Sequence, residues 1–454
     1  ALVAARHLAD WGADVAAYIP RQRRDATHEQ ALLERGLPIV HGEDDDGNGQ
    51  LDALLSVADL VIDGLLGIGQ ERPLDPAEPI GLGLARLREA RGRYQPPKLV
   101  AVDIPTGVAA DTGAVDPLTV EPDLTVTFGL PKVGMYQSPA SSVLSRVQVI
   151  DIGIPAAAQA AVQLELMTSR LIRPLLPGRA TDSNKGTFGR VLAIGGSHRF
   201  AGAPLMVASA AYRAGAGLVT VACPEDVQVM LAGSLPEATW LPLESGDHGE
   251  IEANEVAALR AALPDFDAVV LGPGMGNFED TRALTWALLP DFEHGLVLDA
   301  DALNAVATFP DAAGRVPPQA ILTPHPGEMA RLLGMSVADV QARRLEIAQE
   351  AAQRFGCIVV LKGAHTVIAA ADGRARLSSF ANPLLATAGA GDVLAGIIAG
   401  YLAQGADPFD AASLGVYVHG MTGETLREEL GDSGLLATEL AARLPRTVRD
   451  IRQG

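Results

Sequence analysis

Short runs of β-branched and other apolar residues alternate with longer stretches rich in alanine and leucine along the whole chain. This alternation constrains the fold more than any other feature of the sequence. Before residue 155, the runs that predict strands lie at 14–19, 37–40, 59–63, 98–103, 123–128 and 146–152. The stretches between several of them, such as 83–90, have the composition of helices. Strands that alternate with helices form parallel sheets whose faces are covered by helices. The sequence therefore predicts the α/β class, with three-layer αβα domains.

The pattern also divides the chain. A second alternating series begins at GRVLAIGG (189–196) and continues to the C-terminal helix. Segment 155–179, between the two series, has little strand character, and we expect a helix and a connector there. At about 150 residues per domain, the chain has room for two or three domains. We predict a first domain at 1–160, a linker at 161–178 and a second domain at 179–454.

The first residues predict a helix where such a domain usually has a strand. Residues 1–11 have the pattern of an amphipathic helix, Gly12 suits its left-handed cap, and 14–19 is the next strand. The chain has no initial methionine. We therefore expect that a strand and its loop precede this helix in the complete unit.

Composition excludes several kinds of partner. The 35 basic and 55 acidic residues give a net charge of −20, whereas nucleic acids and anionic membranes require a basic surface. The two cysteines, Cys223 and Cys357, are too few and too far apart for a disulfide framework or a thiolate metal cluster. No apolar stretch reaches the roughly 18 residues of a membrane span. We expect a cytoplasmic protein that binds neither nucleic acid nor membrane.

The segment NPLLATAGAGDVLAGIIAGYLAQG (382–405) carries the strongest chemical signal. Its apolar second half predicts a buried helix, so Gly389, Ala390 and Gly391 lie at a helix N-terminus, where free N–H groups bind anions. Asp392 falls in the first turn. It is either a helix cap, worth about 1 kcal/mol, or a base that accepts a proton from a hydroxyl group attacking a bound phosphate.

This turn resembles the G-x-G-D turn of the ribokinase-like superfamily, and four further segments resemble the ADP- or ATP-dependent NAD(P)H-hydrate dehydratase family. In chain order they are SNKGTFGRVLAIGGSHRFAGAP (183–204), VVLGPGMG (269–276), LTPHPGEMARLLG (322–334) and VVLKGAHTVI (359–368). The resemblance implies a ribokinase-like second domain that uses ADP or ATP, with Mg²⁺, to dehydrate the S form of hydrated NADH or NADPH (NADHX or NADPHX). These versions of the motifs resemble the ADP-using bacterial branch.

The resemblance also assigns residues. The adenine nucleotide is expected to contact the KGAHT segment and the glycine turn: Lys362, Gly363, Ala364, His365, Thr366, Gly389, Ala390 and Gly391. The hydrate is expected to contact Ala203, Gly274, Gly276, His325 and Asp392. The two glycines lack the Cβ atom that would keep the backbone away from a ligand. Two alternatives remain open, because His325 also suits a structural role and Lys362 also suits a surface position.

Three other places in this half have expected roles. Glu328 suits the positive end of the helix that TPHPGE opens and is a candidate for orienting water bound to Mg²⁺. Asn184 and Lys185 precede the first strand of the domain and are expected to cover the phosphates. We interpret LDADALNAV (298–306) mainly as a strand end and scaffold, despite its two aspartates.

The implied chemistry is a phosphorylation followed by an elimination. Asp392 would deprotonate the C6 hydroxyl of the S hydrate, which attacks the terminal phosphoryl group of the nucleotide. The backbone N–H groups of the glycine turn would stabilise the charge on that group. The lone pair of the ring nitrogen would then expel phosphate and restore the dihydronicotinamide.

The first domain has two carboxylates at strand ends. Asp103 ends the strand in LVAVDIPTGVAADTGAV (99–115), and Asp63 ends the strand in DLVIDGLLGIGQERPLDPAEPI (59–80), just before a glycine-rich loop. A carboxylate at the C-terminal end of a parallel strand lies where α/β proteins bind ligands. From the residues alone, Asp103 suits a turn cap equally well.

Together with TVTFGLPKVGMY (125–136) and VIDIGIP (149–155), these segments resemble the NAD(P)H-hydrate epimerase domain, which is Rossmann-like. The resemblance implies that Asp103 is the acid/base that inverts C6 between R and S. It also implies a K⁺ ion bound by Asp63 and by Thr106, which stands where the family usually has serine. The hydrate's phosphates are expected to lie against the glycine-rich loop: Gly67, Ile68, Gly69, Gln70, Glu71, Arg72 and Pro73.

The epimerase family carries a G-N-N-G-G-D-G loop before a helix like the one at 2–15, and its asparagine completes the ion site. Because this chain opens at the helix, we expect a weakened epimerase and a poorly folded first strand if this start is the natural one. Bacteria commonly fuse the epimerase ahead of the dehydratase, so the resemblance implies both activities. We also expect a homo-oligomer. The alternative is a ribokinase-like vitamin-precursor kinase whose first domain is a non-catalytic scaffold.

Overall fold

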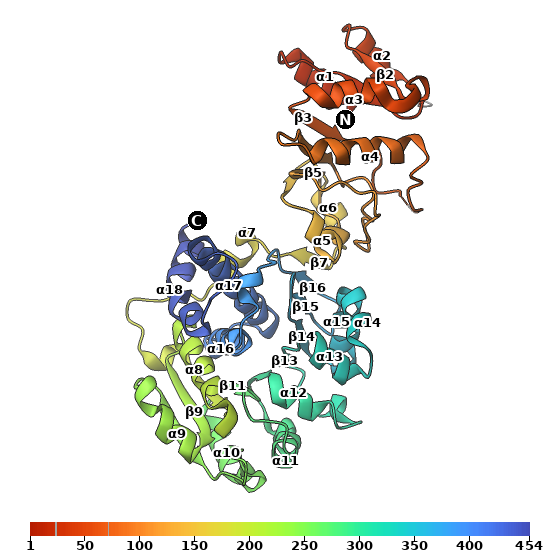
Figure 1. Cartoon of the computed structure of the whole chain (residues 1–454). Helices are drawn as coiled ribbons and strands as arrows, with labels where there is room; N and C mark the ends of the chain where they lie inside the picture. Colours follow the sequence, from red (N-terminus) through yellow and green to blue (C-terminus); the bar gives the residue numbers. More distant parts are fainter. Residues whose placement is uncertain (23–24, 71) are drawn as a thin grey trace. The chain divides into compact units, whose positions relative to one another are not determined.

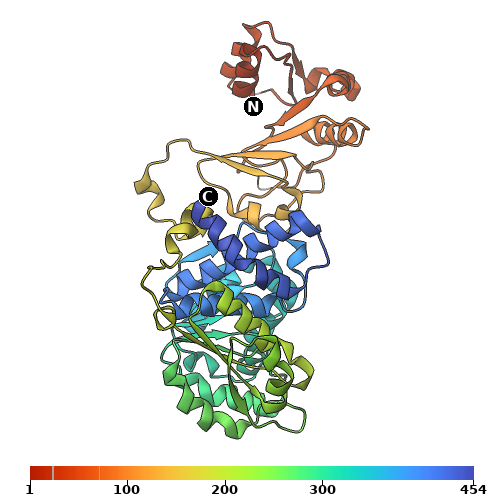
Figure 2. The ribbon, with the colours of Figure 1, turned by 90° about the vertical axis from the view of Figure 1, so that its left-hand side faces the viewer.

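The computed structural model describes residues 1–22, 25–70 and 72–454 of the chain. The chain divides into two compact units, Ala1–Ala161 and Val162–Gly454, and each contains parallel strands with helices packed on them (Figures 1 and 2). The α/β class predicted from the alternating pattern is confirmed. No helix of the described residues is both long and apolar enough to cross a membrane.

The first unit contains short strands and helices in alternation. Its strands are β1 (Ala17–Ile19), β2 (Ile39–His41), β3 (Leu60–Asp63), β4 (Lys98–Val102), β5 (Leu124–Phe128) and β6 (Val147–Ile150). Its α-helices are α1 (Leu2–Asp10), α2 (Thr27–Leu33), α3 (Gly49–Val57), α4 (Pro79–Arg91), α5 (Ala140–Val143) and α6 (Ala156–Gln159). The predicted strands and the N-terminal helix are confirmed to within a few residues.

These strands form two parallel sheets. One pairs β1 with β2, and the other has the order β3-β4-β5-β6. Leucines from α3, α4 and β4 pack together in a core of this unit. Because β3, β4 and β5 run in the same direction, their C-terminal ends meet at one edge of the sheet. Asp63, Asp103 and Phe128 lie at that edge.

The second unit is larger. Its strands are β7 (Leu164–Leu166), β8 (Arg190–Ile194), β9 (Leu218–Pro224), β10 (Thr239–Leu243), β11 (Ala268–Leu271), β12 (Gly295–Leu298), β13 (Ala320–Leu322), β14 (Ile358–Leu361), β15 (Val367–Ala369) and β16 (Ala375–Leu377). Its helices before β14 are α7 (Ser169–Ile172), α8 (Gly202–Ala214), α9 (Glu225–Leu231), α10 (Val256–Ala262), α11 (Glu279–Leu288), α12 (Ala300–Val306), α13 (Pro326–Leu333), α14 (Val337–Ala342) and α15 (Arg344–Phe355). The last three helices are α16 (Ala390–Ala403), α17 (Pro408–Leu430) and α18 (Ala437–Gln453).

All these strands lie in one sheet of order β10-β9-β8-β11-β12-β13-β14-β15-β16-β7. The sheet is parallel except at β15, which runs antiparallel to both of its neighbours. The KGAHT segment (362–366) is therefore the loop of the hairpin between β14 and β15. This loop and the segments that follow β11, β12 and β13 all leave the sheet at the same edge.

Helix α16 is buried along nearly its whole length and packs against α8, although the two are far apart in the sequence (Figure 1). Gly396 and Gly400 permit this close approach. A Cβ at Gly396 would lie 2.3 Å from the carbonyl oxygen of Val207, and one at Gly400 would lie 2.9 Å from that of Ala211. The prediction of a helix packed on all sides is confirmed, and the sheet and helices around it fix the place where α16 begins.

One strand was not expected. Segment 155–179, predicted to be a helix and a connector, contains α6, β7 and α7. β7 pairs in parallel with β16, and Glu165 forms an ion pair of 3.0 Å with Arg376. A three-residue strand is too short to produce an alternating pattern that would predict it. Its partner also lies far along the chain, so no local signal marks the pairing. Both β7 and α7 belong to the second unit.

Candidate active sites

The glycine turn before α16 has the geometry of an anion-binding site. Gly389 has φ = 84°, and a Cβ at this position would lie 2.4 Å from Met206 Sδ, so glycine is required there. The helix begins at Ala390. The N–H groups of its first turn, including those of Gly391 and Asp392, have no acceptor within the helix. Such groups, aided by the helix dipole, bind phosphate.

The Asp392 carboxyl group lies in this first turn. Burial raises its pKa to about 7; the neighbouring Asp299 raises it as well, while Lys362 lowers it. A carboxyl group with a pKa near 7 accepts and returns protons readily at neutral pH. This environment favours the role of a base over that of a simple helix cap.

Lys362 lies next to the glycine turn. Its Nζ is 2.6 Å from Asp299 Oδ1 and 3.9 Å from Glu328 Oε2. Burial alone lowers the pKa of Lys362, but the two carboxylates raise it above its ordinary value, so the ammonium group is charged. Only 17% of the side chain is exposed, which excludes the alternative of a surface lysine. A cation beside a helix N-terminus suits a phosphate group.

Sequence reasoning did not identify Asp299 as part of the site. This residue directly follows β12 and is 1% exposed. Its Oδ1 accepts hydrogen bonds from Lys362 Nζ and from Thr323 Oγ1, at 2.6 and 2.8 Å. The available signal was its place after a buried parallel strand, the same signal that singled out Asp103. The segment 298–306 is thus more than a scaffold.

His325 and Glu328 form the capping box of α13. His325 Nδ1 accepts hydrogen bonds from the N–H groups of Gly327 and Glu328, at 3.0 and 3.3 Å. Glu328 Oε2 in turn accepts one from the N–H of His325, at 2.7 Å. Burial and the nearby Lys362 lower the pKa of His325, so the imidazole is neutral. Its side chain is nevertheless 51% exposed, which leaves an edge of the ring accessible.

Burial raises the pKa of Glu328 to about 7. Its Oε1 lies 3.4 Å from His325 Nε2, so both carboxylate oxygens face His325. Its role in orienting water bound to Mg²⁺ stays a prediction. Among the described residues, no group of three or more His, Cys, Asp or Glu side chains could hold a metal ion.

Hydrogen bonds from Arg344 hold the backbone at the start of the hairpin loop 362–366. The guanidinium group donates hydrogen bonds to the carbonyl oxygens of Leu361 and Lys362, at 3.0 and 3.2 Å. It also lies 3.2 Å from where a Cβ of Gly363 would be, and Gly363 has φ = 136°. The loop backbone is thus fixed, while Gly363 and Ala364 are exposed.

The second half of the loop faces inward. His365 has φ = 49° and is buried, and its N–H donates to the carbonyl oxygen of Phe380 at 2.8 Å. Thr366 Oγ1 donates to the carbonyl oxygen of Gly363 at 2.9 Å. The side chains of His365 and Thr366 therefore shape the loop.

Of the residues expected to contact the hydrate, Ala203 and Gly274 lie close together. A Cβ at Gly274, which has φ = 72°, would lie 2.9 Å from the Cβ of Ala203. A Cβ at Gly276 would lie 2.2 Å from the ring of Phe278. The protein's own atoms therefore account for glycine at both positions, whereas we expected close approach to a ligand to be the reason. Gly276 N–H donates to Asp301 Oδ2 at 2.7 Å.

Asn184 and Lys185, expected to cover the phosphates, are exposed at the start of the 3₁₀ helix Lys185–Phe188. Asn184 caps that helix through a 2.9 Å hydrogen bond from the N–H of Gly186. Their relation to a phosphate stays a prediction.

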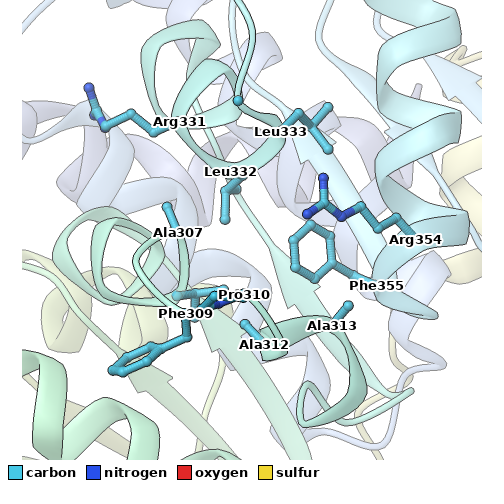
Figure 3. Close-up of a pocket in the computed structure, with 12 residues that line it drawn as sticks. Ala307, Phe309, Pro310, Ala312, Ala313, Arg331, Leu332, Leu333, Arg354 and Phe355 are labelled. Carbon is cyan, nitrogen blue, oxygen red and sulfur yellow. The ribbon is translucent and has the colours of Figure 1, made fainter.

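The pocket drawn in Figure 3 is a different place. It is lined by the C-terminal ends of α12, α13 and α15, and Arg331 and Arg354 project beside it. Helix α13 separates it from His325, which lies at the helix's other end. None of the candidate site residues lines it, so it is not part of the site.

In the first unit, Asp103 follows β4 with φ = 69°, a left-handed conformation that costs a residue with a side chain of order 1–3 kcal/mol. Strain of this size persists only where the surroundings hold it. Asp103 Oδ1 accepts hydrogen bonds of 3.1 Å from Thr127 Oγ1 and from the N–H of Phe128, and a further one from Lys132 Nζ. Lys132 is a second residue that sequence reasoning missed.

Asp63 and Thr106 are in direct contact. Thr106 donates to Asp63 through its hydroxyl group at 2.7 Å and through its N–H at 2.9 Å. Both residues are buried. A buried carboxylate beside a hydroxyl oxygen is the kind of donor set that a hard cation such as K⁺ prefers, so these residues fit the ion.

The glycine-rich loop lies beside this pair. Gln70 Oε1 accepts a 3.0 Å hydrogen bond from the N–H of Gly107, next to Thr106. The described loop residues are otherwise exposed, with Ile68 at 62%. Glu71, predicted to contact the hydrate, lies outside the described residues.

These features define a class of protein: a two-domain nucleotide-binding enzyme with a Rossmann-like first unit and a ribokinase-like second unit. Two family matches agree. The family described as NAD(P)H-hydrate dehydratase matches residues 191–446, and the family described as YjeF-related protein N-terminus matches residues 1–134.

Whole-chain relatives identify the family. The bifunctional NAD(P)H-hydrate repair enzyme Nnr of Moorella thermoacetica is 38% identical and covers 100% of this chain and 85% of its own length. The enzyme of the same name from Escherichia coli is 37% identical over 86% of this chain and 72% of its own. The chain belongs to the bifunctional NAD(P)H-hydrate repair enzyme family.

A solved structure supports the fold expected for the second unit. The ADP/ATP-dependent NAD(P)H-hydrate dehydratase from Bacillus subtilis, co-crystallised with ATP/Mg²⁺, has a TM-score of 0.56 and 35% identity. It covers 64% of this chain and 100% of that chain. A ribokinase-like superfamily protein from Enterococcus faecalis, with a TM-score of 0.56 and 27% identity over 64% of this chain and 98% of its own, confirms the prediction of a ribokinase-like second domain.

Proposed function

We propose that this protein repairs hydrated NADH and NADPH, with an epimerase in its first unit and a nucleotide-dependent dehydratase in its second. The observation that carries the dehydratase is the meeting of Asp392, whose pKa is about 7, with the charged Lys362 at the start of α16. Membership of the family over the full chain supports both activities. The alternative of a vitamin-precursor kinase with a scaffold domain is not favoured.

In the dehydratase, the ionised Asp392 accepts the proton of the C6 hydroxyl group of the S hydrate as its oxygen attacks the terminal phosphoryl group of ADP or ATP. The N–H groups at the start of α16 and the ammonium group of Lys362 stabilise the charge on that phosphoryl group. Asp299 keeps Lys362 in place. Gly363 and Ala364 present their backbone to the nucleotide.

The phosphorylated hydrate then loses phosphate. The lone pair of the ring nitrogen forms a double bond to C6, and the C6–O bond breaks with its electrons leaving on phosphate. Loss of a proton from the ring restores the dihydronicotinamide. Ala203, Gly274, Gly276 and the exposed edge of His325 are the residues that we assign to the hydrate.

In the epimerase, Asp103 takes the proton of the C6 hydroxyl group, and the oxygen electrons form a carbonyl bond as the C6–N1 bond breaks with its electrons on the ring nitrogen. The nitrogen then adds back to the opposite face of C6, and Asp103 returns the proton to the oxygen, which gives the opposite configuration. The hydrate's phosphates lie against the glycine-rich loop of residues 67–73. Asp63 and Thr106 would hold K⁺, which adds positive charge beside that loop. Mg²⁺ would accompany the nucleotide in the dehydratase, since the Bacillus subtilis enzyme was co-crystallised with ATP together with Mg²⁺.

We also propose that the protein is cytoplasmic and assembles as a homo-oligomer. Its two free cysteines, Cys223 and Cys357, are buried, which suits a reducing compartment. Exposed apolar side chains such as Trp11 and Tyr94 offer surface for a second copy. Sedimentation analysis tests the oligomer.

The test of the dehydratase is to incubate separated S-NADHX with the protein, MgCl₂ and either ADP or ATP. Absorbance at 340 nm and inorganic phosphate should rise together, and the nucleotide that supports the faster rate is the preferred donor. Asp392→Asn should lower the rate by about 10²–10⁴-fold. A stable phosphorylated product without recovery of absorbance would instead identify a kinase.

A further inference from the structure

Lys132 in the first unit is half-buried beside a candidate catalytic residue. It follows β5 across a short turn, and only 17% of its side chain is exposed. Its Nζ donates hydrogen bonds to Asp103 Oδ1, to Thr127 Oγ1 at 2.9 Å and to the carbonyl oxygen of Phe128 at 3.2 Å. An ammonium group has three protons, so all three have acceptors within the protein. Lys132 is therefore committed to Asp103 and its neighbours and is not a free cation for a phosphate group.

The hydrogen bonds around Asp103 are also asymmetric. The donors from Lys132, Thr127 and the N–H of Phe128 all meet Oδ1. Three donors saturate this oxygen and fix the plane of the carboxylate. Oδ2 is the oxygen left to meet a substrate hydroxyl group.

We propose that Lys132 is a positioning residue of the epimerase site, whose ammonium group holds Asp103 as a carboxylate with Oδ2 directed to the C6 hydroxyl group. The inference rests on the epimerase activity proposed above and adds a residue to it. The proton moves from the hydroxyl oxygen to Oδ2 and back, so a turnover consumes no acid or base.

The balance of charges agrees with this role. Burial raises the pKa of Asp103, but the hydrogen bonds from Lys132 and from the N–H of Phe128 lower it below its ordinary value. Among the described residues that bond to Asp103, Lys132 is the charged one, and Thr127 and Phe128 supply neutral donors. Without Lys132, burial would be opposed only by neutral donors, so the pKa of Asp103 would rise.

The experiment measures conversion of R-NADHX to S-NADHX by the full chain between pH 4 and 8.5, with the uncatalysed rate subtracted. Lys132→Met removes the charge at similar length and should move the acid limb upward by about one unit or more, so its rate should fall toward pH 4 under conditions where the wild-type rate still holds. Lys132→Arg keeps the charge and should retain the limb of the wild type. Turnover of S-NADHX with ADP should be unchanged in both variants.

Thr127→Val provides a second route if Lys132→Met does not fold. It removes a neutral donor to the same oxygen, so it should shift the limb in the same direction by a smaller amount. Folding of each variant is checked by circular dichroism. A folded Lys132→Met protein with the rate and pH profile of the wild type would overturn the inference, because a merely structural lysine changes stability and not the profile.

A titration separates this inference from the function on which it rests. In protein labelled with ¹³C at aspartate carboxyl groups, Asp103→Asn identifies the Asp103 signal. Its titration should move to higher pH in Lys132→Met, and an unmoved titration would overturn the inference even in an active enzyme. A wild type that does not convert R-NADHX would overturn the epimerase activity, while the titration still decides whether Lys132 holds the carboxylate ionised.

Discussion

Asp392 and Asp103 are both proposed bases, and each must be ionised to act although its carboxyl group is partly removed from water. The surroundings move the pKa values of the two carboxyl groups in opposite directions. Burial is the largest influence on both carboxyl groups. At Asp392 it prevails over Lys362, whereas at Asp103 the hydrogen bonds prevail over burial. The two residues therefore offer a comparison within one chain, since one base has a raised pKa and the other a lowered one.

The first prediction concerns the pH dependence of the two activities. Asp392 acts as a base only when ionised, and its pKa is about 7. Below pH 7 the protonated fraction grows, so kcat/KM for S-NADHX should fall about tenfold per pH unit on the acid side. Epimerase activity should stay nearly constant over the same range, because the pKa of Asp103 lies below its ordinary value. Equal dehydratase rates at pH 5.5 and 8 would contradict the assignment.

The second prediction links the same group to stability. The pKa of Asp392 is about 7 in the folded protein against an ordinary 3.8, so the folded state holds the proton more tightly than the unfolded state. The stabilisation of the folded state by this proton is therefore fully present below about pH 4 and is lost as pH rises through 7. Asp392→Asn should raise the Tm at pH 8 by at least about 2 °C, with a smaller gain at pH 5.

The control for that measurement is Asp265→Asn, because Asp265 is exposed. It should leave the Tm within about 1 °C of the wild type at both pH values. An Asp392→Asn protein that is less stable than the wild type at pH 8 would show that the carboxylate stabilises the fold as a cap.

Single residues also show what could be predicted from the sequence. Asp392 and Asp103 were found because each lies at the end of a recognisable element. Lys132 was not, because its role depends on a partner on another strand. Asp299 was not either, although it too follows a buried strand, because nothing local shows that it pairs with Lys362. Lys132 meets Asp103 across 29 residues, and Asp299 meets Lys362 across 63. Glu328 lies in the first turn of α13, as its place in TPHPGE predicted, and forms a capping box with His325.

At the scale of elements, the start of α16 depends on the helix that packs over it. Gly389 has φ = 84°, and Gly405, two residues past the end of α16, has φ = 86°. A Cβ at Gly389 would lie 2.4 Å from Met206 Sδ, whereas nothing lies within 4 Å of one at Gly405. A side chain would therefore meet the same backbone strain at both positions but different surroundings.

The third prediction uses this matched pair. Gly405→Ala should cost about 1 kcal/mol, the strain of a side chain at positive φ, and leave the KM for ADP unchanged. Gly389→Ala should cost clearly more and raise the KM for ADP, because the turn must move away from Met206. Thermal unfolding and steady-state kinetics measure both effects. Equal losses of stability with unchanged KM would mean that the turn is not part of the nucleotide site.

The elements were largely predictable, and the pairing between them was not. Alternating composition predicts β3 to β6 because each is a local run of apolar residues. The separation of β1 and β2 from that sheet leaves no local signal, and neither does β7. Sheet order is set by contacts between distant segments, and the sequence pattern of one strand does not name its neighbour.

At the scale of the whole molecule, each unit has a hydrophobic core of its own. The first packs α3 and α4 on β4, and the second buries α16 between its sheet and the surrounding helices. The two candidate sites lie wholly within separate units, with Asp103 in the first and Asp392 in the second.

The fourth prediction follows from this separation. Asp103→Asn should abolish conversion of R-NADHX and leave turnover of S-NADHX with ADP within about twofold, since the two sites share no residues. Asp392→Asn should do the reverse. The double variant should lose both activities. If either single variant impaired both reactions more than tenfold, the two sites would not be independent.

The edge strand β7 has a consequence for synthesis of the protein. β7 pairs with β16, and Glu165 lies opposite Arg376 in the register, so the ribosome must add 211 further residues before the partner exists. At about 5–20 residues per second, this takes roughly 10–40 s. Throughout that time residues 164–166 have no strand to pair with, so this end of the sheet forms only late in synthesis.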